Sequence, residues 1–170
     1  GRVPLLTASD VNAAVRRARH AQPAWSQLSF RGRARFILSA REIVLARVEE
    51  IATLIALDTG KPPAEAISME VAPTLDLMQY FARNAERMLK RQKINIGQFE
   101  LMGRSSYLVY KPLGVVGIIS PWNFPWATPL DEVVMALMAG NAVVLKPSEF
   151  TPFTALKIGE IFKQAKLPDG

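Results

Sequence analysis

Apolar residues over positions 1–60 recur with the period of an α-helix. Over residues 9–22 an apolar side chain returns every three or four positions, and Pro23 is expected to end this first helix. The same spacing predicts helices over 31–47 and 49–58, and Gly60 is a favourable stop signal for the latter. This part of the chain is therefore predicted to be almost entirely helical.

The pattern of residues 61–111 predicts one long helix followed by a hairpin. The helical period continues over 64–90, with Met69, Leu77, Phe81, Ala85 and Met88 as its apolar residues. Pro73 should kink this helix or divide it because proline has no backbone N–H. Around 93–97 and 104–111 polar and apolar residues alternate as they do in strands, and glycines bracket a possible turn between them. Two strands cannot bury a face alone, so this hairpin requires a partner sheet.

Residues 113–170 follow a strand–helix–strand–helix pattern. The runs 113–120 and 141–147 are apolar and of strand length, as expected for buried parallel strands. Helices are predicted over 128–140 and 151–168, and Thr151 can cap the second of them. The alternation predicts the opening of a doubly wound α/β sheet, in which a site lies beyond the carboxyl ends of the strands. Because such a sheet needs further strands, we expect the chain to be the front part of a longer protein.

The composition is that of a globular protein. Of the 170 residues 49% are hydrophobic and 21% are charged, and no apolar run approaches the ~18 residues that a transmembrane helix needs. The N-terminus lacks the apolar core of a signal peptide. We therefore expect a cytoplasmic protein with no membrane partner. The absence of cysteine excludes a thiolate nucleophile and cysteine-ligated metals within this chain, and no other cluster predicts a metal site.

The net charge of +6 raises the question of nucleic-acid binding. The basic excess lies in the first two thirds of the chain, on predicted helices with few interleaved aromatic residues. Such side chains usually coat a solvated helix face rather than a base-stacking surface. No nucleic-acid partner is therefore predicted. His20, within this arginine-rich region, is likewise expected to be solvated.

The loops that follow the two predicted strands carry the polar residues best suited to chemistry. Asn123 lies between Pro121 and Pro125, and its amide could donate a hydrogen bond to an oxygen that gains negative charge. Taken alone, an asparagine in a proline-rich turn can equally well have a structural role in the turn. Lys146 and Glu149 could both reach the hydroxyls of a ribose, although an exposed charge pair would have the same spacing. The chain has no GxGxxG fingerprint of the usual dinucleotide fold.

These loops belong to segments that resemble the aldehyde dehydrogenase superfamily. The matching segments are 118–125 (IISPWNFP), 139–149 (AGNAVVLKPSE), 58–62 (DTGKP), 110–116 (YKPLGVV), 151–152 and 167–168. They extend over nearly the whole chain in the family's order and spacing. The resemblance implies an oxidoreductase that oxidises an aldehyde to a carboxylic acid, with NAD as cofactor and NADP possible.

The resemblance also implies roles for particular residues. Asn123 would be catalytic and would steady the oxyanion. The expected cofactor contacts are Trp122 and the backbone near Ile119 and Ser120 on the nicotinamide side, Lys146 with Glu149 on the adenosine ribose, and Pro121, Asn123, Pro147 and Ser148 beside them. Residues 1–92 and 113–170 would form the start of a Rossmann-like cofactor-binding domain. The hairpin 93–112 would belong to a bridging sheet that assembles a homodimer or homotetramer.

One departure from the family pattern is severe. The family's catalytic cysteine and general-base glutamate lie downstream of the matched segments, and this chain holds no cysteine at all. We therefore expect the 170-residue chain alone to be inactive and its parent protein to be the enzyme. The alternative is a non-catalytic binding or assembly module that uses the same half-fold.

Overall fold

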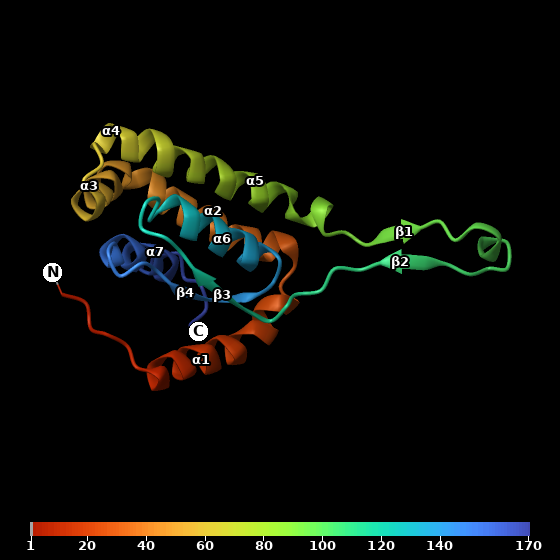
Figure 1. Ribbon diagram of the computed structural model, residues 1–170. Helices are drawn as coiled ribbons and strands as arrows, with labels where there is room; N and C mark the ends of the chain where they lie inside the picture. Colours follow the sequence, from red (N-terminus) through yellow and green to blue (C-terminus); the bar gives the residue numbers. More distant parts are fainter. Residues whose placement is uncertain (1) are drawn as a thin grey trace.

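The computed structural model describes residues 2–170. The helices are α1 (Ala8–Gln27), α2 (Phe30–Ala46), α3 (Val48–Thr59), α4 (Pro63–Ala66), α5 (Ala72–Met88), α6 (Ala127–Met138) and α7 (Pro152–Gln164). The strands are β1 (Gln92–Ile94), β2 (Ser106–Leu108), β3 (Val115–Ile119) and β4 (Ala142–Lys146). The predicted fold class is confirmed: N-terminal helices, a hairpin and a βαβα unit follow one another in an α/β chain (Figure 1).

The first helix continues past its predicted end. Pro23 lies inside α1, which ends only at Gln27. An internal proline normally breaks a helix, at a cost of ~3 kcal/mol. Here the last turn carries Trp25, whose side chain is buried and donates from Nε1 to the Leu137 carbonyl at 2.9 Å. This contact with α6 stabilises the extra turn. Because Trp25 and Leu137 are 112 positions apart, the apolar pattern of residues 9–22 does not reveal the contact.

The predicted long helix over 64–90 is divided, but upstream of Pro73. A π-helical turn, Ile67–Val71, precedes α5, and the N–H of Ala72 donates to the Ile67 carbonyl. Pro73 itself lies in the first turn of α5, directly after the π turn.

The π turn also changes which side chains are buried. An extra residue in one turn rotates the following positions by about 100° around the axis. Met69, expected on the apolar face, is half exposed, whereas Glu70, Thr74 and Met78 are fully buried. The apolar face that we predicted for this segment is therefore partly wrong.

The hairpin projects away from the helices as a long arm (Figure 1). β1 and β2 pair antiparallel, with Lys93 opposite Tyr107, and each strand has three residues. The predicted hairpin is confirmed, although its strands are shorter than 93–97 and 104–111 because neither strand packs its face on the core. Its exposed large apolar residues are Ile94, Phe99, Leu101, Met102, Tyr107, Leu108, Val109 and Tyr110.

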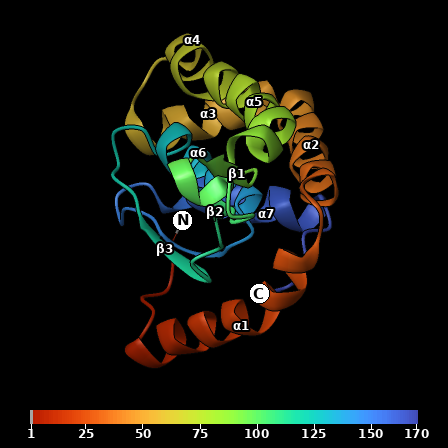
Figure 2. The same ribbon diagram turned by 90° about the vertical axis from the view of Figure 1, so that its right-hand side faces the viewer.

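β3 and β4 form the predicted parallel pair, joined through α6. Val115 lies opposite Ala142 and Ile119 lies opposite Lys146. In both views α6 lies on one side of this pair and α1 on the other (Figures 1 and 2). Gly140 closes α6 with a φ of +90°, and a Cβ there would come within 3.0 Å of Pro112. Only glycine fits this position without strain.

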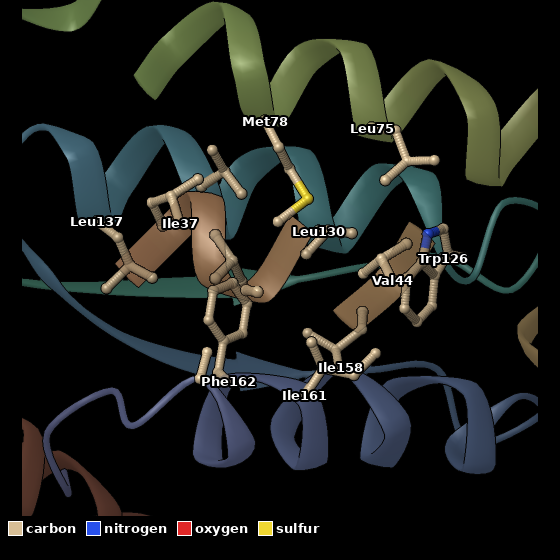
Figure 3. Close-up of a cluster of buried hydrophobic side chains, with 14 of the residues drawn as sticks. Ile37, Val44, Leu75, Met78, Trp126, Leu130, Leu137, Ile158, Ile161 and Phe162 are labelled. Atoms are coloured by element: carbon tan, nitrogen blue, oxygen red, sulfur yellow. The ribbon is translucent and has the colours of Figure 1, made fainter. Parts of the chain in front are cut away.

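One hydrophobic cluster joins the N-terminal helices to the βαβα unit. Figure 3 shows Ile37 and Val44 of α2, Met78 of α5, Leu130 of α6 and Ile158 of α7 directed toward a common centre. All five are nearly inaccessible to solvent. Burying such side chains stabilises the fold by about 1.5–3 kcal/mol each. Residues on both sides of the hairpin therefore share a single core.

Side chains of the N-terminal helices also form hydrogen bonds with backbone groups at the end of α6 and the start of α7. At the carboxyl end of α6, the donors are Trp25 Nε1 to the Leu137 carbonyl, Arg33 Nε to that of Met138 and Gln22 Nε2 to that of Gly140. At the start of α7, Asp58 accepts from the Thr154 N–H and hydroxyl at 2.9 and 2.8 Å. Thr151, predicted to cap α7, makes no side-chain cap. Asp58 replaces it because its carboxylate is a stronger acceptor than a hydroxyl.

The helices in the described part of the chain do not combine the length and the apolar character that a membrane crossing demands.

Candidate functional site

The parallel register brings the two predicted site loops to the same edge of the sheet. Ile119 is paired with Lys146 as the last residues of β3 and β4. One step beyond, the Ser120 N–H donates to the Lys146 carbonyl at 3.1 Å. The segments Ile119 to Asn123 and Lys146 to Glu149 therefore leave the sheet side by side, as the strand pattern predicts.

Most of the predicted site residues face solvent. Ile119 is 81% exposed and Trp122 is 55% exposed. The exposed set also includes Pro121, Asn123, Lys146 and Glu149, Pro147 is half-buried, and Ser120 and Ser148 are buried. The site is thus an open surface at the strand ends. A separate apolar cavity of 330 Å³ beside β4 includes only Pro147 of these residues.

Asn123 is held through its backbone, and its side chain is free to act. Its carbonyl accepts a hydrogen bond from Lys61 Nζ at 2.6 Å. Within residues 2–170 its amide group makes no hydrogen bond. Both N–H groups of the amide are therefore available to a bound oxygen. Amide N–H groups are among the donors that can stabilise a developing oxyanion.

The loop depends on a buried ion pair that our sequence analysis did not assign to the site. Glu70, in the π turn, is fully buried and accepts from Lys61 Nζ at 2.5 Å. Its second oxygen accepts from the N–H groups of Trp126 and Ala127 at 2.9 and 3.2 Å. No local pattern points to Glu70, because the helical period places Met69 on the apolar face of this segment.

Lys146 and Glu149 form an exposed ion pair after β4. Lys146 Nζ lies 3.2 Å from Glu149 Oε2, and both side chains are more than half exposed. The backbone N–H of Glu149 and then the Lys146 side chain lower the pKa of the Glu149 carboxyl, so it is ionised at neutral pH. The pair presents a cationic donor and an anionic acceptor next to each other.

Three buried polar atoms near the loops have no hydrogen-bond partner within residues 2–170. They are the hydroxyl oxygens of Ser120 and Thr151 and Oδ1 of Asp131, which lies in the second turn of α6. Burial, with a smaller contribution from the neighbouring Glu132, raises the pKa of Asp131 to about 6. Among residues 2–170 no three metal-ligating side chains gather.

Comparison with known proteins identifies the family of the chain. The model of the aldehyde dehydrogenase family matches residues 1–170. The chain belongs to the aldehyde dehydrogenase family.

Solved structures of similar proteins support the same fold. An NAD-dependent aldehyde dehydrogenase from Sinorhizobium meliloti is 40% identical, with a TM-score of 0.88 over 98% of this chain and 32% of its own. PnpE, a protein of Pseudomonas sp. WBC-3 solved with nicotinamide adenine dinucleotide, is 35% identical, with a TM-score of 0.91 over 99% of this chain and 34% of its own. An NADP-dependent enzyme from E. coli is 32% identical, with a TM-score of 0.92 over the same shares of the two chains. The chain spans about a third of the length of these family structures.

Asp131→Asn is expected to stabilise the chain at about pH 8 and to change little at about pH 3.5. A carboxyl whose pKa is raised in the folded state favours folding when protonated, and this contribution is lost as the pH rises from about 4 through about 6. Because the side chain is only half-buried and solvent screens it, we expect a gain of about 1–2 kcal/mol at the higher pH. Urea unfolding at both pH values measures the difference.

Asp76→Asn is the matched control, because Asp76 is an exposed carboxylate on α5. It should leave the free energy of unfolding unchanged at both pH values. If Asp131→Asn changes the free energy of unfolding equally at the two pH values, the raised pKa of Asp131 is contradicted.

Proposed function

We propose that this chain forms the cofactor-binding portion of an enzyme that oxidises an aldehyde to a carboxylic acid with NAD⁺. The observation that carries the proposal is the Asn123 loop: its backbone is anchored at the strand edge, and its amide is free to donate. The family match and the NAD-dependent aldehyde dehydrogenase among the similar structures support it.

The residues at the strand ends fit a dinucleotide. Lys146 and Glu149 supply a donor and an acceptor for the vicinal hydroxyls of the adenosine ribose, and both are exposed enough to reach a ligand. Trp122 and the backbone of Ile119 and Ser120 would line the nicotinamide side. NAD⁺, when bound, accepts the hydride that leaves the aldehyde carbon.

Asn123 would act on the aldehyde oxygen. As a nucleophile attacks the carbonyl carbon, negative charge develops on this oxygen, and a pre-positioned amide stabilises the charge without having to reorganise. The family's nucleophile is a cysteine, which these 170 residues lack. The chain covers only 34% of the PnpE chain. We therefore propose that the nucleophile and the general base belong to a part of the parent protein outside this sequence.

The hairpin would serve assembly. Its two short strands expose a row of apolar and aromatic residues and unpaired backbone edges. Proteins usually cover or pair such edges. We propose that residues 93–112 pair with another subunit in a homodimer or homotetramer.

Asn123→Ala in the full-length enzyme should lower kcat by about a hundredfold or more, because losing one donor to an oxyanion typically costs ~3 kcal/mol in the transition state. The KM for NAD⁺ should change much less. Steady-state kinetics, with a deuterated aldehyde to identify the rate-limiting step, measure both. Asn12→Ala, at an exposed position on α1, is the control and should retain full activity.

An unchanged kcat in Asn123→Ala, with hydride transfer limiting the rate, would leave Asn123 a purely structural residue. The 170-residue chain alone serves as the blank in the same assay. It should form no NADH from any aldehyde because it has no thiol.

Glu149 is expected to select against NADP⁺. A 2′-phosphate on the ribose would bring nearly two negative charges close to the carboxylate, while Lys146 and solvent offset part of the repulsion. NAD⁺ should therefore be preferred by roughly tenfold to a hundredfold in kcat/KM. Glu149→Gln should narrow this preference, mainly by improving the use of NADP⁺.

Steady-state kinetics with both cofactors measure the preference, and Glu86→Gln, an exposed glutamate on α5, is the control. If the wild type uses the two cofactors equally, or if Glu149→Gln leaves the ratio unchanged, Glu149 is not the selector.

Leu101→Glu combined with Val109→Glu should convert the full-length oligomer to a smaller species. Both side chains are exposed on the hairpin arm, and charges there would have to be desolvated against the partner subunit. Sedimentation velocity measures the change. Leu57→Glu, at an equally exposed position on α3, should leave the assembly intact. A wild-type enzyme that sediments as a monomer would refute this role for the hairpin.

A further inference from the structure

We infer that Lys61 is a positioning residue for the Asn123 amide and that the buried carboxylate of Glu70 keeps Lys61 in place. The inference rests on the proposed function of Asn123 and assigns the residues that set its geometry. Lys61 contacts the loop after β3 through the Asn123 carbonyl and the Phe124 ring. Glu70 contacts Lys61 and the start of α6, so both residues act on the Asn123 amide through this loop.

Lys61 makes three contacts at the base of the loop. Its Nζ donates to the Asn123 carbonyl at 2.6 Å, donates to Glu70 Oε1 at 2.5 Å, and lies 3.9 Å from the centre of the Phe124 ring. An ammonium with these partners has little freedom to move, because two hydrogen bonds and an aromatic ring hold it. Lys61 is a flexible side chain that tertiary contacts hold still.

The loop has few other means of holding its shape. Pro121 and Pro125 have no backbone N–H, so this stretch cannot continue the ladder of the sheet. Within residues 2–170, Lys61 is the only side chain that gives a hydrogen bond to residues 121–125. Its removal would free the Asn123 carbonyl to rotate, and the position of the amide depends on this backbone. A misplacement of about 1 Å at a reacting centre can cost about a hundredfold in rate.

Glu70 links this contact to the start of α6. One carboxylate oxygen accepts from Lys61, and the other accepts from the N–H groups of Trp126 and Ala127. Trp126 in turn donates from its indole Nε1 to the Thr74 hydroxyl at 3.1 Å. The loop is therefore bounded on one side by the β3 edge and on the other by this buried network, with Lys61 fixing its middle.

Removing Lys61 alone would also leave Glu70 buried without a counter-charge, which destabilises a protein whatever its catalytic role. A second substitution separates the two effects. In Lys61→Met/Glu70→Gln no charge remains to be compensated, and the Gln oxygen can still accept from the N–H groups of α6. Lys163→Met, at an exposed position on α7, is the matched control for the loss of a lysine.

The test uses the full-length enzyme in wild-type and Asn123→Ala backgrounds. In the wild-type background, Lys61→Met/Glu70→Gln should lower kcat by about tenfold to a hundredfold while the Kd for NAD⁺ and the Tm stay close to the wild-type values. Lys163→Met should keep kcat within about threefold of the wild type. Glu70→Gln alone should lower kcat by less than the double substitution, because Lys61 loses its counter-charge but can still donate to the Asn123 carbonyl. In the Asn123→Ala background, the same double substitution should have almost no further effect on kcat, because Lys61 acts only through Asn123.

The outcomes distinguish this inference from the proposed function. If Asn123→Ala lowers kcat but Lys61→Met/Glu70→Gln does not, only the positioning role is wrong. A loss of equal size in both backgrounds also overturns it, because Lys61 would then act independently of Asn123. If the full-length wild type oxidises no aldehyde, or if Asn123→Ala has the wild-type kcat, the proposed function fails and the inference fails with it.

Discussion

A carboxylate with no solvent exposure must have its charge compensated by the protein, and in this chain that carboxylate is Glu70. Lys61 supplies the opposite charge, and two backbone N–H groups at the start of α6 supply the remaining hydrogen bonds. Lys61 lies in the connection between α3 and α4, and both N–H groups lie at the start of α6. Glu70 therefore joins the π turn to these two segments, and Lys61 extends the network to the Asn123 carbonyl.

Side chains of the N-terminal helices likewise satisfy backbone groups of the βαβα unit. Trp25 and Arg33 satisfy carbonyls at the end of α6, and Asp58 satisfies the first turn of α7. Helix ends leave backbone groups without partners, and buried groups of this kind must be satisfied. Because side chains from α1, α2 and α3 complete both crossover helices, these helices are part of the framework that presents the strand ends.

The proposed site combines a fixed element with an adjustable one. The Asn123 carbonyl is anchored by a short hydrogen bond. Lys146 and Glu149 are exposed, and within residues 2–170 their side chains pair only with each other. A donor stabilises a transition state more strongly when it does not have to reorganise. Long exposed side chains can instead adapt to the hydroxyls of a cofactor. This difference in rigidity matches the roles that we propose for the two loops.

The sequence by itself determined the helices α2, α3 and α6, the parallel strands and the two loops at their ends, because hydrophobic periodicity and strand–helix alternation are local properties. It also placed Asn123, Lys146 and Glu149 at one edge of the sheet. Only the tertiary structure decided that α1 continues past Pro23, that Asp58 rather than Thr151 caps α7, and that Glu70 and Lys61 support the Asn123 loop. The bond from Trp25 to Leu137 joins residues 112 positions apart, and that from Thr154 to Asp58 joins residues 96 apart. Such contacts stabilise a helix end or a buried charge only when the fold brings the partners together, and no pattern read within a few turns of the chain contains them.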